Sequence, residues 1–79
     1  MEIKRFYRTQ RDLACAINYS IDAYWNDKLS EESLEITVKE LFENNKNKLI
    51  KGQQFTTIIQ QQCGKRRLEI VSKVLGLVL

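Results

Sequence analysis

The sequence predicts an all-α fold, a compact bundle of three or four helices built as a single helical domain over residues 1–79. The chain is too short for two independent cores. It contains no proline and only three glycines, so few residues interrupt a helix. Apolar residues recur at spacings of three and four, the period of one helix face. We expect roughly 65–75 % of the residues to be helical, about twice the average share.

A basic arm over residues 1–8 precedes the first predicted helix, which spans about residues 10–26. The sequence leaves open whether the arm is a short strand or an extended segment packed on the body. Thr9 is the expected N-cap of the helix, with Asp12 in the first turn, where the helix dipole favours a carboxylate. The predicted buried stripe comprises Leu13, Ile17, Ile21 and Tyr24, widened by Ala14, Ala16 and Trp25.

The second predicted helix spans residues 31–45 and has the clearest start signal in the chain. Ser30 is its expected N-cap, and two glutamates follow in the first turn. Leu29 and Leu34 occupy the two positions of a hydrophobic staple. The predicted buried stripe is Leu34, Val38, Leu41 and Phe42.

A connection rich in lysine and asparagine leads to a third predicted helix over residues 54–63. A fourth predicted helix, over residues 65–77, is apolar over more than half of its circumference. Such breadth requires either central burial or a partner. The sequence leaves open whether Gly64 breaks the chain between these helices or lies inside one continuous helix. The residues expected inside the third helix are Phe55, Ile58, Ile59 and Cys63.

The charges are segregated along the chain. Residues 12–43 carry eight acids and two bases, whereas residues 44–79 carry seven bases and one acid. Three of those bases form the block Lys65, Arg66 and Arg67. If a helix begins there, each cation lies near the positive end of the dipole and costs about 0.3 to 1 kcal/mol. A bound phosphate would reverse that cost, since free backbone N–H groups and guanidinium groups favour it.

These cations predict a nucleic-acid-binding site formed by Lys65, Arg66, Arg67 and Lys73, with the N-terminal arm in support. The segment partly matches a helix-turn-helix, with Gly64 at the turn. Gln60 and Lys65, however, occupy positions where that motif prefers small or apolar residues. The leading hypothesis is a small non-enzymatic regulatory or nucleic-acid-binding module.

Two other interpretations of the cations stay open. In a continuous helix they would be ordinary surface residues, pairing weakly with Glu69. Alternatively, Arg66 and Arg67 pair with the acidic second helix, within one molecule or across a dimer.

The rival function is a protein–protein interaction module or homodimer formed through the apolar last helix. The interface residues predicted for it are Leu68, Val71, Leu75, Leu77 and Val78.

The remaining composition argues against other classes of protein. The chain has no histidine, and Cys15 and Cys63 form no metal-ligand pattern, so we expect no enzyme activity, no metal and no cofactor. Both cysteines are predicted to be packing residues. Tyr24 and Trp25 are interpreted as core or edge-of-core residues rather than base-stacking platforms. Without a long apolar run, the protein is expected to be cytoplasmic, with no membrane contact.

Three stretches, FYRTQRDLA, DAYWNDKLSEESL and CGKRRLEIV, together resemble a family of short bacterial and phage proteins. The resemblance covers nearly the whole chain. It implies a small cytosolic protein. That family has no established function, so the resemblance implies no activity and no site residues.

Overall fold

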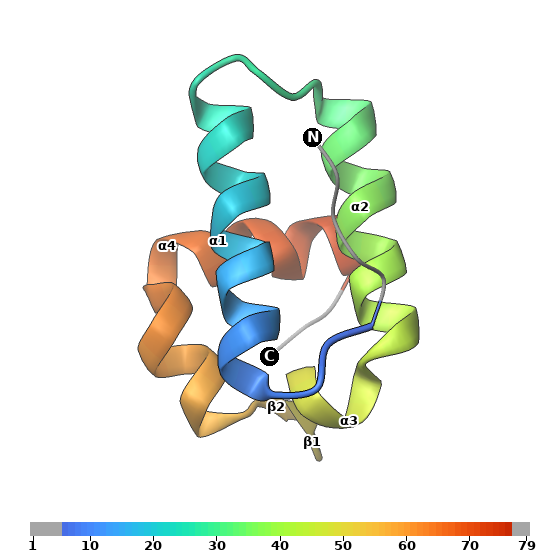
Figure 1. Cartoon of the computed structure of the whole chain (residues 1–79), viewed down its shortest axis with the longest axis vertical. Helices are drawn as coiled ribbons and strands as arrows, with labels where there is room; N and C mark the ends of the chain where they lie inside the picture. The colour runs from blue at the N-terminus through green and yellow to red at the C-terminus, as the bar shows by residue number, and fades with distance from the viewer. Residues whose placement is uncertain (1–5, 77–79) are drawn as a thin grey trace.

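Helices dominate the computed structural model, which describes residues 6–76 (Figure 1). The all-α prediction is confirmed, with 75 % of the described chain in helices. One short antiparallel hairpin accompanies them. The elements in chain order are α1 (Gln10–Trp25), α2 (Glu31–Asn44), α3 (Lys46–Leu49), β1 (Ile50–Lys51), β2 (Gln54–Phe55) and α4 (Thr57–Leu75).

The first two helices begin where their caps predict. The Asp12 backbone N–H donates to Thr9 Oγ1 at 3.0 Å, and the Ser33 backbone N–H donates to Ser30 Oγ at 3.1 Å. Each bond satisfies one N–H group that a helix leaves free in its first turn. Leu29 packs on the core next to α2, as expected of a hydrophobic staple. The two helices lie side by side, joined by the loop at the top of Figure 1.

The predicted third helix begins later than expected. Residues 54–55 form β2, in which Phe55 pairs with Ile50 across a turn containing Gly52. Gly52 has φ +67°, a conformation that costs glycine little. The backbone N–H of Thr56 then donates to Leu49 O, so α4 starts only at residue 57. A helical start at residue 54 was therefore wrong, since the hairpin uses those backbone groups.

The N-terminal arm is described only from Phe6 onward. Phe6 and Tyr7 belong to no helix or strand, and the Tyr7 N–H donates to Asn45 Oδ1 at 3.0 Å. The side chain of Tyr7 packs against the core. In this described part, the arm is an extended segment that packs on the body.

Gly64 divides α4 into two helical segments. Its backbone, at φ 82° and ψ 167°, is non-helical, whereas helical structure continues on both sides of it. The first segment runs beside α1, and the second turns away and crosses behind α1 towards α2 (Figure 1). The second segment ends at Leu75, capped by Gly76 in a left-handed conformation, rather than at the predicted residue 77, which lies outside the described residues.

The crossing segment explains why the last helix is so widely apolar. Leu68 and Val71 are 7 % and 0 % exposed and belong to one core with residues from α1 and α2. Ile70, Val74 and Leu75 pack against the edge of the same core. Central burial thus accounts for the apolar residues on this side of the helix. Ile58, predicted to be inside, is instead 37 % exposed, because the first segment of α4 turns only Ile59 and Cys63 inward.

We expect Gly64→Ala to destabilise the fold by about 2 to 3 kcal/mol, since its φ and ψ lie in a region that essentially only glycine occupies. An added Cβ would meet no heavy atom within 4 Å, so the cost is backbone strain rather than a clash. Urea unfolding followed by circular dichroism measures it.

Gly76→Ala is the matched control. Gly76 also has open space around it but sits in the ordinary left-handed region, where alanine costs roughly 1 kcal/mol. If Gly64→Ala destabilised the protein no more than Gly76→Ala, the kink would not be a constraint on the fold.

Candidate nucleic-acid interface

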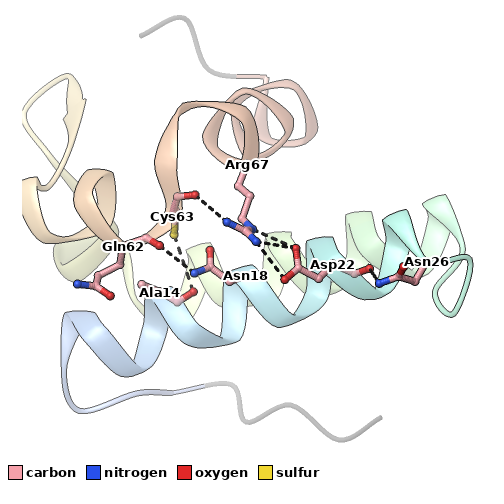
Figure 2. A network of polar contacts seen from close by, with 7 residues as sticks. All are labelled: Ala14, Asn18, Asp22, Asn26, Gln62, Cys63 and Arg67. Carbon is pink, nitrogen blue, oxygen red and sulfur yellow. Dashed lines mark hydrogen bonds and ion pairs between the residues drawn. The ribbon is translucent and has the colours of Figure 1, made fainter.

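One stripe of α1 faces the kink of α4. Ala14, Asn18 and Asp22 lie four residues apart, so they share a helix face. Each contacts the chain around Gly64 (Figure 2). The kink is therefore held against α1 at three successive turns.

Two of these contacts involve the backbone just before the kink. A helix leaves its last carbonyl groups without intrahelical partners, and unpaired buried carbonyls are costly. Asn18 Nδ2 donates to Gln62 O at 3.0 Å, and Arg67 Nη1 donates to Cys63 O at 3.2 Å. One side chain of α1 and one side chain of α4 thus each hydrogen-bond a carbonyl group at the end of the first segment of α4.

The Arg67 side chain is itself held by a carboxylate of α1. Its Nη2 lies 2.9 and 3.1 Å from the two oxygens of Asp22, and its Nε donates to Asp22 Oδ1 at 3.1 Å. The two side chains are 31 % and 45 % exposed, so solvent screens part of the attraction. One interpretation of the sequence expected the acidic partner of this arginine on the second helix. In the structure, that partner lies on the first helix.

Lys65 and Arg66 take no part in this pairing and are exposed. Within residues 6–76 neither forms an ion pair. The Arg66 guanidinium carbon instead lies 6.0 Å from the ring centroid of Trp25, and that of Arg67 lies 5.7 Å from the same centroid. We call Trp25, Lys65 and Arg66 the Trp–Arg surface. It joins the C-terminal end of α1 to the first turn after the kink.

Lys73 lies seven residues after Arg66, two turns along the same helix, and is also exposed without an ion pair to the described residues. Glu69 lies between them on that face. Of the basic arm, only residues 6–8 are described; Arg8 is exposed just before α1. Of the four predicted cations, three are thus exposed on the second segment of α4, whereas Arg67 is committed to the Asp22 pair.

The residues predicted for a protein interface are distributed differently. Leu68 and Val71 lie in the core of the chain itself, and Leu75 is partly buried against that core. Leu77 and Val78 lie outside the described residues. Of the predicted interface residues that the structure describes, Leu75 is therefore the one that remains partly exposed.

The two cysteines differ in environment. Cys63 is 2 % exposed, and its Sγ lies 3.8 Å from the Ala14 carbonyl oxygen, as predicted for a packing residue. Burial raises the pKa of the Cys63 thiol from 9.0 to about 11, although the nearby Arg67 charge opposes the shift. Cys15 was predicted to be buried, but it is exposed, because it lies on the outer face of α1.

Sequence reasoning missed Trp25 and Asp22. Trp25 was assigned to the apolar side of the first helix, yet it is 45 % exposed because α1 ends there, beside the cations of α4. The only signal for Asp22 was its spacing of four from Asn18, a polar pair on the flank of the apolar stripe. No residue nearby in sequence marks either one as a neighbour of Arg67.

Among the described residues, no group of three or more histidine, cysteine, aspartate or glutamate side chains is placed to hold a metal ion. The helices formed by residues 6–76 include none with the length and apolar character needed to cross a membrane.

Comparison with known proteins places the chain in a family. The family CLB_0814_fam, described as "Conserved hypothetical protein", matches residues 4–76. The chain belongs to this family. Membership confirms the resemblance to a family without an assigned activity, whereas the bacterial or phage origin stays a prediction. No curated protein and no solved structure is significantly similar to the chain.

A double-mutant cycle on Asp22→Ala and Arg67→Ala should give a coupling free energy of about 0.5 to 1 kcal/mol, the upper range for a solvent-accessible pair with forked geometry. The coupling should weaken with added salt. Arg67→Ala alone should cost more than Asp22→Ala, because it also removes the donor to Cys63 O. Additive single effects would contradict the pair.

Thiol labelling of the native protein should modify Cys15 at least roughly 100-fold faster than Cys63, because burial and a raised pKa both suppress the reactive thiolate of Cys63. In denaturant the two rates should converge. Equal native labelling rates would contradict this environment.

The raised pKa of Cys63 also makes stability depend on pH, because the unfolded chain loses the thiol proton before the folded chain does. The contribution of the Cys63 thiol to the free energy of unfolding is full below pH 9.0 and is lost as the pH rises towards about 11.

Proposed function

We propose that this protein is a small, non-enzymatic, cytoplasmic regulatory module that binds nucleic acid through Lys65 and Arg66, with Lys73 in support. One observation carries the proposal. The kink exposes Lys65 and Arg66 in the first turn of a helical segment, with no ion pair to any described residue. Cations at that position disfavour the helix unless an anion is bound.

Arg67 has a different part in this proposal. Its forked bonds to Asp22 and its bond to Cys63 O occupy the guanidinium group, so it positions the first turn rather than contacting phosphate. Arg66 has no ion pair or hydrogen bond to the described residues, so its guanidinium group can present two parallel N–H donors to a phosphate group, the geometry in which arginine binds phosphate best.

A helix-turn-helix mode supports the proposal only in part. The two segments of α4 change direction at a glycine, as the helices of that motif do. The connection, however, is one non-helical residue, whereas the motif uses a turn of three or four residues. The proposal therefore rests on the exposed cations and not on this motif.

Fluorescence anisotropy of labelled oligonucleotides, measured from low to physiological salt, tests the proposal. The double variant Lys65→Glu, Arg66→Glu should weaken binding at least tenfold at low salt. It should also reduce the slope of log affinity against log salt by about 2, roughly one unit for each lost phosphate contact.

Lys39→Glu is the control and should leave binding nearly unchanged. It makes the same change of charge per residue at an exposed site on α2. Arg67 is unsuitable for charge reversal, because a glutamate there would face Asp22 and destabilise the fold. Absence of binding at low salt, or equal losses in the test and control variants, would refute the proposal.

The competing function is a homodimer or protein complex formed through the last helix. Ile70, Val74 and Leu75 favour it, since they remain only partly buried on the described chain. Light scattering discriminates the two: a strict monomer at high concentration that still binds oligonucleotide excludes the dimer as the active form.

A further inference from the structure

We infer that the Trp–Arg surface binds single-stranded nucleic acid, with an unpaired base stacked on the indole of Trp25 and the adjoining phosphates on Arg66 and Lys65. The inference rests on the proposed function and specifies its substrate class. It adds a residue, Trp25, that the fold leaves 45 % exposed.

Trp25 is placed as a platform for a planar ligand. It is the last residue of α1, and 45 % of its surface is exposed although two guanidinium groups lie over its ring. Tryptophan is on average among the most extensively buried residues, because its ring removes a large apolar area from water. An indole left half open next to exposed cations can recover that area by stacking on a ligand.

The charges around the ring match a nucleotide rather than a purely apolar partner. Arg66 reaches the ring from α4, and Lys65 precedes it in the same turn. A nucleotide presents a flat base joined to a charged phosphate, so one nucleotide can use the ring and a cation together. Tyr19 is also exposed on α1, but no cation from residues 6–76 lies over its ring, so it lacks the second half of this arrangement.

A single strand suits this surface better than a duplex does. Bases in a duplex stack on each other, and only an unpaired base offers a face to an aromatic side chain. The second segment of α4 exposes three cations and one acid, Glu69, which lies between Arg66 and Lys73. So few phosphate contacts give weak binding on their own, and base stacking supplies the additional affinity.

Trp25 is the only tryptophan of the chain, so its fluorescence reports stacking directly. The experiment titrates the full-length protein with a labelled single strand of about 12 nucleotides, within the site sizes of known single-strand binders. DNA and RNA versions are both used. Comparison ligands are the duplex of the same sequence, an abasic strand, and polyglutamate. Anisotropy measures binding and tryptophan emission measures stacking.

We expect the single strands to bind at least several-fold more tightly than the duplex and the abasic strand, and to quench Trp25 emission strongly. The DNA and RNA arms show which backbone is preferred. Trp25→Leu should weaken single-strand binding by roughly 5- to 150-fold, the range that one aromatic–base stack accounts for. Trp25→Phe should keep most of the affinity. Tyr19→Leu is the matched control and should keep all of it, with circular dichroism confirming that each variant is folded.

Other outcomes separate this inference from the proposed function. Equal binding of single strand, duplex and abasic strand without quenching would overturn base stacking while leaving the proposed function standing. Polyglutamate binding as tightly as the single strand would overturn the inference of single-strand binding in favour of an acidic protein partner. Absence of any oligonucleotide binding at low salt would overturn both.

Discussion

The kink at Gly64 is the constraint on which the rest of the structure depends. It turns the second segment of α4 across α1 and α2, which brings Leu68 and Val71 into the core. A kink of this kind leaves carbonyl groups to be satisfied, and side chains of α1 and α4 do so at Gln62 and Cys63. The glycine, the two donors and the core are thus parts of one arrangement: without the kink the apolar side of the last segment would have no core to enter.

The same arrangement links stability to the proposed binding surface. Asp22 holds Arg67, and Arg67 holds the backbone at the kink, so this cation of the basic block serves the fold (Figure 2). The neighbouring cations, Lys65 and Arg66, stay exposed beside Trp25. Cations in the first turn of a helical segment disfavour the helix. Such local conflict with helix preferences is typical of sites where binding, rather than folding, determines the residues.

Local signals in the sequence predicted much of the fold. The caps at Thr9 and Ser30 and the stripes of the first two helices act within a few residues, so they can be recognised without tertiary structure. The hairpin before α4 could not be predicted, because two-residue strands have no periodicity and depend on backbone bonds such as that from Thr56 to Leu49. The site was half predicted. The basic block is visible in the sequence, but Asp22 and Trp25 lie at least forty residues before it and join it only through the path of α4.

Solution NMR of the uniformly labelled protein tests the central claim most directly, because it observes the kink and its packing together. The account predicts helical contacts between residues three apart within 57–63 and within 65–75, none spanning Gly64, and long-range contacts from the Trp25 indole to the Arg67 side chain. Uninterrupted helical contacts from Thr57 to Leu75, with no contact between Trp25 and Arg67, would contradict it.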